Sequence, residues 1–139
     1  MAPVVVAAAV VERDGRLLLT RRREGSHLSG YWEFPGGKLE QGESPAEAVM
    51  RECLEECGLR VRPRRLLDVV FHRYPERDVL LLFYECQWLA GRVRHLGVAA
   101  HAWVRPDELS RFPLPPADEP IVRRLQRRAR RRTRPPAAQ

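Results

Sequence analysis

The order of hydrophobic patterns along the chain predicts an α/β domain in which helices pack on a mixed β-sheet. Apolar runs rich in β-branched residues, typical of strands, lie on both sides of one clearly bounded amphipathic helix. A second amphipathic helix follows the last of these runs. Strands and helices in this order build a layered sheet-and-helix architecture. A chain of 139 residues suffices for one such domain with its own core.

The first two strands are predicted to form a hairpin. Val4–Val11 is a continuous apolar run, and the turn-forming residues 12–15 separate it from a second run, Arg16–Thr20. Residues 21–31 are polar and contain glycine, which favours a loop. Trp32–Phe34 then predicts a short strand that ends at a Pro-Gly-Gly sequence.

The central helix has recognisable signals at both ends. Ser44 suits the N-cap position, Pro45 suits the first helical position, and Glu47 completes a capping box with Ser44. Gly58 is the residue expected just beyond the C-terminal end. One apolar stripe runs along the helix and predicts its buried side, formed by Ala46, Val49, Cys53 and Cys57.

The second half of the chain is predicted as four extended segments, a short helical turn and a final helix. The extended segments are Val61–Leu67, Asp68–Tyr74, Val79–Leu89 and the less regular Val98–Val104. Pro106–Ser110 indicates the helical turn. Asp118–Arg132 indicates an amphipathic helix whose inward residues are Ile121, Val122 and Leu125.

The net charge of +7 comes from one end of the chain. Residues 1–120 carry 17 basic and 18 acidic residues, whereas residues 121–139 carry eight arginines and no acid. We expect the Arg/Pro-rich segment 127–139 to be a disordered tail. Arginines can neutralise nucleic-acid phosphates, but no aromatic residue stands among them for base stacking. The sequence therefore favours a solvated tail over a nucleic-acid-binding one.

Hydropathy and cysteine content indicate a cytoplasmic protein. No apolar run reaches the roughly 18–20 residues that a membrane span needs, and the opening Val4–Val11 run lacks the basic flank of a signal peptide. The three cysteines are an odd number, and no second Cys/His pair accompanies Cys53 and Cys57 at zinc-site spacing. They are predicted to be small buried residues in a reducing compartment. No sequence feature indicates an oligomeric state.

Three carboxylates are predicted to share one face of the central helix. Glu52, Glu55 and Glu56 are three or four positions apart, so their like charges destabilise the helix unless something compensates them. A hard divalent cation such as Mg²⁺ takes carboxylate oxygens alongside substrate phosphates. Arg51 can pair with Glu55 at i,i+4, which leaves Glu52 and Glu56 as the stronger ligands. The alternative is a solvated acidic face.

Residues 37–59 resemble the Nudix box. That motif requires Gly, five residues, Glu, seven residues, Arg-Glu, an apolar residue, any residue, Glu-Glu, any residue, Gly and an apolar residue. The matching positions are Gly37, Glu43, Arg51, Glu52, Cys53, Glu55, Glu56, Gly58 and Leu59. Val6–Arg22, Trp32–Lys38 and Pro113–Val122 are similar to the MutT-like branch of the Nudix hydrolases. The resemblance implies a Nudix α/β/α sandwich with a mixed β-sheet, here over residues 1–126.

The resemblance also implies an activity. MutT-like Nudix hydrolases are Mg²⁺-dependent (Mn²⁺ being a substitute) and convert nucleoside triphosphates to monophosphate and pyrophosphate. An oxidised substrate such as 8-oxo-dGTP, whose removal serves DNA repair, is the leading expectation, with CTP or dCTP as the alternative. A third possibility from another class is a weakly active domain that senses nucleotides.

The resemblance also implies roles for the residues at matching positions of this chain. The implied catalytic residues are Glu52, Glu55 and Glu56, with Glu52 as the favoured general base. The implied metal ligands are Gly36, Gly37, Glu52, Glu55 and Glu56. The implied substrate-binding residues are Arg22, His27, Glu33, Phe34, Pro35, Gly36 and Asp118. The residues implied to brace the loop and helix are Glu43, Arg51 and Gly58.

Two positions depart from the family pattern. Some members supply another carboxylate from the strand before the C-terminal region, but no Asp or Glu lies between Glu85 and Asp107 here. His101 could act as the base instead, or the helix glutamates could suffice. At the base-reading position the 8-oxo-dGTP enzyme has Asn, whereas this chain has Asp118. Asp118 could also be the N-cap of the last helix.

Overall fold

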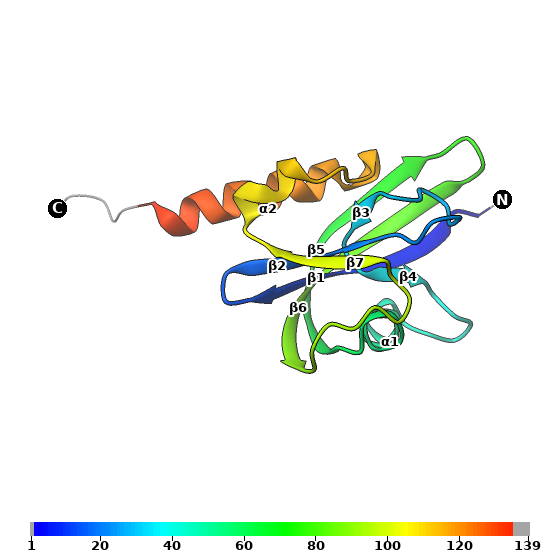
Figure 1. The fold of residues 1–139 in the computed structure, drawn as a ribbon. Helices are drawn as coiled ribbons and strands as arrows, with labels where there is room; N and C mark the ends of the chain where they lie inside the picture. Colours follow the sequence, from blue (N-terminus) through cyan, green and yellow to red (C-terminus); the bar gives the residue numbers. More distant parts are fainter. Residues whose placement is uncertain (1, 135–139) are drawn as a thin grey trace.

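A computed structural model describes residues 2–134 and shows one helix on each face of a mixed β-sheet (Figure 1). The strands are β1 (Val4–Arg13), β2 (Arg16–Arg21), β3 (Trp32–Glu33), β4 (Gly36–Lys38), β5 (Arg60–Arg73), β6 (Asp78–Ala90) and β7 (Ala100–Val104). The helices are α1 (Pro45–Cys57), α2 (Glu119–Thr133) and the short 3₁₀ turns η1 (Pro106–Arg111) and η2 (Pro116–Asp118). The predicted α/β/α sandwich is therefore confirmed.

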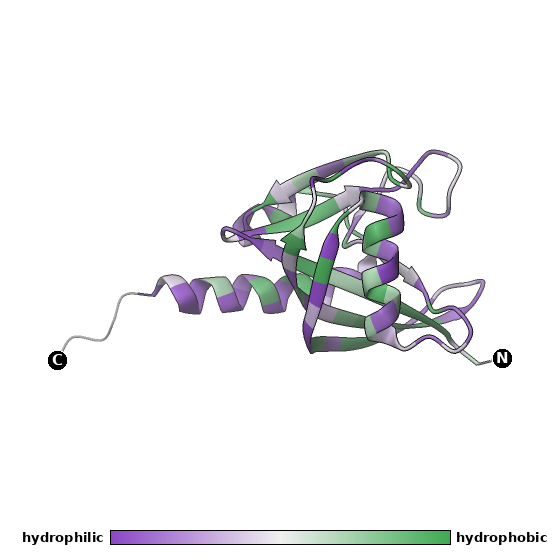
Figure 2. Ribbon diagram, turned by 90° about the horizontal axis from the view of Figure 1, so that it is seen from below, coloured by the Kyte–Doolittle hydropathy of each residue, from purple (hydrophilic) through white to green (hydrophobic). Residues whose placement is uncertain are grey.

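Strand β1 is the centre of the sheet. It runs parallel to β6 and antiparallel to β2 and β4, within the strand order β3-β2-β1-β6-β5; β4 also pairs β1, and β7 also pairs β2. Alternate residues of β1 enter two separate cores: Ala7 and Ala9 pack toward α1, and Ala8 and Val10 toward α2. Burial on both faces explains why the segment is apolar throughout rather than alternating. Figure 2 shows the apolar residues along these strands and the polar end of α2.

Helix α1 forms as its sequence predicts. The Ser44 side chain accepts a hydrogen bond from the Glu47 amide (3.2 Å), and the Glu47 carboxylate accepts one from the Ser44 amide (3.0 Å). Gly58 ends the helix with a left-handed φ of 67°, a conformation that favours glycine. Val49 and all three cysteines are buried, and the cysteines are free thiols.

Several strands differ from the prediction. Val61–Leu67 and Asp68–Tyr74 join into the single long strand β5, which is irregular near Pro63 and Leu66 where bulges shift its register against β6. Strand β4 was not predicted, because its Gly-Gly-Lys sequence has no apolar alternation. A side chain on Gly36 would come within 2.1 Å of the Ala7 carbonyl oxygen, so the pairing of β4 with β1 depends on glycine there.

The prediction of a disordered tail is wrong for residues 127–133. Helix α2 continues to Thr133, because its inward arginines find distant acidic partners: Arg128 pairs with Glu85 on β6, and both Arg128 and Arg132 pair with Glu12 on β1. Residues 135–139 lie outside the described part of the chain. Within the described part, no helix is long and apolar enough to cross a membrane.

Candidate active site

A cavity of about 440 Å³ opens between the sheet, α1 and η2. Its walls come from the start of β1, the strands β3, β4 and β6, the loop after β2 and the turn between β5 and β6. It brings together nine of the residues that the sequence predicts as site residues: Arg22, His27, Glu33, Phe34, Gly36, Gly37, Glu52, Glu56 and Asp118. Pro35 and Glu55 do not line it.

Glu52 and Glu56 form the acidic end of this cavity. Burial and the nearby carboxylates of Glu52 and Glu33 raise the pKa of Glu56 to about 8. Strand β4 lies directly against Glu52, since a side chain on Gly37 would come within 2.7 Å of the Glu52 carboxyl carbon. Gly37 therefore lets the backbone of β4 approach the carboxylates of α1.

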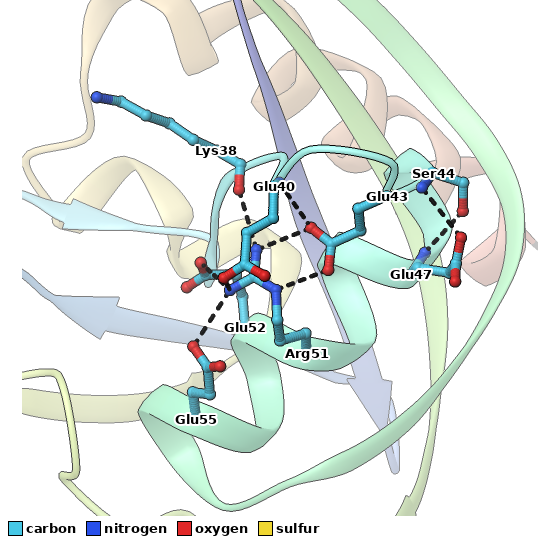
Figure 3. Close-up of polar contacts among 8 residues, drawn as sticks. All are labelled: Lys38, Glu40, Glu43, Ser44, Glu47, Arg51, Glu52 and Glu55. Atoms are coloured by element: carbon cyan, nitrogen blue, oxygen red, sulfur yellow. Dashed lines mark hydrogen bonds and ion pairs between the residues drawn. The ribbon is translucent and has the colours of Figure 1, made fainter.

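Arg51 fixes the orientation of the helix carboxylates (Figure 3). Its Nε and Nη2 donate to the two carboxylate oxygens of Glu43, at 2.7 and 2.9 Å, and Nη2 also donates to the Lys38 carbonyl at 3.0 Å. Its Nη1 donates to Glu52 at 2.8 Å and to Glu55 at 3.2 Å. The hydrogen bond from Arg51 lowers the pKa of Glu43. The predicted Arg51–Glu55 pair is present, and Arg51 also holds Glu52, which the i,i+4 argument did not anticipate.

The three carboxylates lie near one another on α1, but only Glu52 and Glu56 line the cavity. Glu55 is 58% exposed and Glu52 only 14%, although both lie on the side of Arg51 away from Glu43 (Figure 3). Within residues 2–134, no three His, Cys, Asp or Glu side chains stand together as a ready metal cage. Glu52 adjoins both of the others: it shares an Arg51 nitrogen with Glu55 and contacts Glu56 directly.

The chemistry of the acidic end nevertheless fits a hard divalent cation. Its donors are carboxylate oxygens of Glu52, Glu56 and Glu33 beside backbone groups of β4, and these are the ligands that Mg²⁺ prefers. Burial is the largest cause of the raised pKa of Glu56, and repulsion between these carboxylates adds to it. A bound cation would remove that repulsion.

Arg22 and Glu33 lie on the wall between the acidic and apolar parts of the cavity. Arg22 Nη1 donates to both Glu33 oxygens, at 2.9 and 3.1 Å, and Arg22 Nε donates to the His27 carbonyl. Burial raises the pKa of Glu33, and Arg22 opposes that shift. The apolar part of the lining comes from β1, β6 and the residue after β3, namely Val4, Val6, Phe34, Val79, Leu81 and Phe83.

Asp118 lies at the apolar end and does not cap α2. Its backbone is helical (φ −86°, ψ −7°), and its side chain makes no capping hydrogen bond, whereas an N-cap residue is normally extended. The expectation of a capping role is therefore wrong. Asp118 is 4% exposed and lines the cavity. Burial, and then Glu33, raise the pKa of its carboxyl to about 7.

Tyr74 is a cavity residue that the sequence did not reveal. It follows β5, and its ring lies edge-on to His72 (centroids 4.4 Å apart) and to His27 (6.0 Å). Its pKa is raised, chiefly by burial and next by the charge of Asp118. No local pattern places Tyr74 near Asp118, because the two belong to segments that meet only in the folded sheet.

His101 lies outside the cavity lining. It pairs across the sheet with Thr20, and its Nδ1 is 2.8 Å from Nε2 of His95. Burial and His95 lower the pKa of His101. Its ring is thus engaged with another histidine, and nothing in this geometry supports the hypothesis that it replaces a missing carboxylate.

The fold and the carboxylate-bearing α1 define a Nudix domain, and comparison with known proteins agrees. The family model of the NUDIX domain matches residues 6–124. The chain belongs to the Nudix family of hydrolases, which generally use a divalent metal ion.

Its relatives place it in the MutT-like branch of that family. It is 30% identical to the 8-oxo-dGTP diphosphatase of Escherichia coli K12 over 128 residues, 91% of this chain and 99% of the relative. It is 34% identical to the CTP pyrophosphohydrolase of the same organism over 122 residues, 88% and 90% of the two chains. The crystal structure of the MutT protein from Methanosarcina mazei Go1 superposes with a TM-score of 0.82 at 27% identity, covering 91% and 96% of the two chains.

Proposed function

We propose that this protein hydrolyses nucleoside triphosphates to nucleoside monophosphate and pyrophosphate, with an oxidised purine nucleotide such as 8-oxo-dGTP as the leading substrate. One observation carries the proposal. A single cavity joins a carboxylate end, formed by Glu52 and Glu56, to an apolar end that contains the buried Asp118. A triphosphate suits the first end once a cation is present, and a nucleobase suits the second.

At the acidic end, the residues of the chain would bind the metal ion and accept a proton. Glu52 and Glu56 would hold Mg²⁺ (or Mn²⁺), with Glu55 and the carbonyls of Gly36 and Gly37 as further oxygen ligands. When bound, such an ion neutralises phosphate charge and makes water more acidic. Glu52 then accepts the proton of the attacking water while one phosphoric anhydride P–O bond breaks and pyrophosphate departs with that bond's electron pair.

The other predicted residues position the nucleoside. Arg22 and Glu33 hold each other on the wall of the cavity, with His27 beside Arg22. Phe34 contributes an apolar surface, and the Pro35–Gly36 backbone follows it. The helix and the loop before it are held in place by Glu43, Arg51 and Gly58. Removal of oxidised nucleotides before polymerisation would make this a cytoplasmic, DNA-repair-related activity.

The second candidate substrate is CTP or dCTP, and Asp118 is the observation that favours it. An ionised carboxylate only accepts hydrogen bonds, which suits the amino group of cytosine. A protonated carboxyl can also donate, which suits O6 of 8-oxoguanine. With its pKa near 7, Asp118 can present either form.

The test is a panel of normal and oxidised nucleoside triphosphates incubated with Mg²⁺, followed by detection of pyrophosphate and monophosphate. We expect pyrophosphate from 8-oxo-dGTP at the highest kcat/KM. Preferred cleavage of dCTP would select the second candidate. Tight nucleotide binding without product would instead identify a nucleotide sensor and overturn the proposed hydrolysis.

A further inference from the structure

The C-terminal half of α2 extends beyond the sheet (Figures 1 and 2). Its first turns bury Ile121 and Leu125 in the core. One and two turns further on, the same side carries Arg128 and Arg132, which are bound to carboxylates of the sheet. The inward side of the helix is therefore apolar at its start, and the charges of the inward arginines further on are neutralised.

The outward side carries arginines that are not neutralised in this way. Arg127, Arg130 and Arg131 are separated by three and four positions, so they share one helix face; we call them the arginine stripe. All three are exposed. Among residues 2–134, none of them has an acidic partner within ion-pair distance. Like charges at these spacings destabilise a helix, and an anionic ligand would remove that cost.

The groove beside the helix is not the anionic site. A cavity of about 780 Å³ lies between α2, η1 and the β1–β2 turn and contains several arginines. Most of them already have partners: Arg105 binds Asp107, and Arg128 and Arg132 bind Glu12. Arg130, at the edge of this groove, belongs to the stripe. The uncompensated charge thus lies on the outer surface of the helix.

We propose that the arginine stripe binds the phosphate backbone of nucleic acid. Repeated phosphates complement a row of guanidinium groups, which present planar forks of donors suited to phosphate oxygens. The stripe contains no aromatic or aliphatic anchor. A protein partner normally requires such anchors at the centre of an interface, whereas nucleic-acid interfaces are polar and strongly basic. The sequence alone favours a solvated tail over nucleic-acid binding. The ordered helix changes this preference, because it aligns the charges on a fixed scaffold.

The chemistry of the stripe sets the kind of binding. Phosphate contacts carry no sequence information, so affinity does not depend on base sequence. Neutralising three phosphates on a duplex gives a log–log salt dependence with a slope of about −2.7. Between 50 and 200 mM salt, affinity then falls about 40-fold. The stripe lies outside the catalytic cavity, so hydrolysis of free nucleotides does not require it.

The experiment measures fluorescence anisotropy of a labelled 20-base-pair duplex of arbitrary sequence over 50–200 mM NaCl. The test variant is Arg127→Gln/Arg130→Gln/Arg131→Gln. The matched control is Arg60→Gln/Arg62→Gln/Arg92→Gln, which removes the same charge from exposed arginines on and beside β5 and β6. We expect the test variant to bind at least tenfold more weakly at 50 mM with a slope near zero, and the control to stay within twofold of the unmodified protein.

Two further measurements keep the result decisive. The variant Arg127→Lys/Arg130→Lys/Arg131→Lys retains the charge and should retain the salt slope, which separates charge loss from helix loss. Circular dichroism and nucleotide hydrolysis should be unchanged in every variant. Equal weakening in the test and control variants would overturn the proposal, because it would indicate diffuse attraction. Equal affinity for a labelled poly-glutamate peptide would assign the stripe to acidic proteins instead.

Discussion

Arg51 donates from Nε and Nη2 to the two oxygens of Glu43, at 2.7 and 2.9 Å, while its Nη1 donates to Glu52 at 2.8 Å. The loop before α1 and the acidic end of the cavity are thus connected through one guanidinium. A planar fork held on one side by a carboxylate presents its remaining donors in a fixed direction. Glu43 therefore acts on the site through Arg51, without lining the cavity.

The first prediction separates this positioning role from a purely structural one. Glu43→Gln weakens the charge-assisted bonds that hold Arg51, so we expect kcat to fall about tenfold, a loss of about 1.4 kcal/mol in transition-state stabilisation, with KM within about threefold. Glu47→Ala is the control, because Glu47 caps α1 away from the cavity. It should lower the melting temperature while kcat stays the same. If both variants change only stability, Glu43 has no role in positioning.

The second prediction concerns the cavity carboxylates. Glu52→Gln and Glu56→Gln should each reduce kcat by about a thousandfold or more, since each change removes about 4 kcal/mol or more of transition-state stabilisation. Folding should persist in both variants. Glu56→Gln in particular removes the cost of burying a carboxyl beside other carboxylates, so the melting temperature of this variant should not drop. Glu55→Gln is the comparison, because Glu55 is exposed and outside the cavity lining. In this variant kcat should fall by no more than about tenfold. Near-normal turnover of Glu52→Gln would refute the assignment of the site.

Part of this site could be predicted from the sequence, and part could not. Helix α1 was predictable because its caps and apolar stripe are local signals, and the carboxylates follow from their spacing along it. Two features depend on contacts between distant segments. Asp118 adopts a helical backbone inside a buried pocket, and α2 extends because Glu12 and Glu85 lie beneath its arginines. Local composition cannot reveal such partners, so the sequence predicted a disordered tail and left a capping role for Asp118 open beside its role in base recognition.

The third prediction tests whether the end of α2 contributes to catalysis. Deleting residues 127–139 should leave kcat/KM within about twofold, because none of residues 127–134, the described part of this segment, lines the candidate cavity. Stability should fall, because Glu12 loses Arg128 and Arg132, and Glu85 loses Arg128. Arg128→Gln should reproduce much of that loss of stability without shortening the chain. A truncated protein that stays folded yet loses hydrolysis would place the arginines on the substrate path.

The fourth prediction follows from the buried carboxyl of Asp118. Its pKa is about 7 in the folded protein against an ordinary value of 3.8, so the folded state holds this proton more tightly than the unfolded state does. The stability that this group contributes is fully present below pH 4 and is lost as the pH rises through 7. Asp118→Asn has no such titration. Thermal melts from pH 4 to pH 8 should therefore show the Asn variant gaining stability relative to the unmodified protein. A constant difference across this range would show that the carboxyl is not buried as described.

The last prediction asks which base Asp118 recognises. Above pH 7 the ionised carboxylate only accepts hydrogen bonds, so it faces O6 of 8-oxoguanine as two opposed oxygens, whereas an Asn amide donates to O6 and accepts from N7–H. One polar mismatch of this kind costs about 1–3 kcal/mol, so Asp118→Asn at pH 8 should raise the kcat/KM ratio of 8-oxo-dGTP over dCTP by about tenfold or more. At pH 5.5 the carboxyl is protonated and can itself donate, and the effect of the substitution should shrink. Measuring both substrates at both pH values separates base recognition from a general loss of activity, because only recognition changes the ratio with pH. A ratio that is the same in both proteins at pH 8 would mean that another part of the cavity reads the base, with Tyr74, which lines the same cavity, as the residue to substitute next.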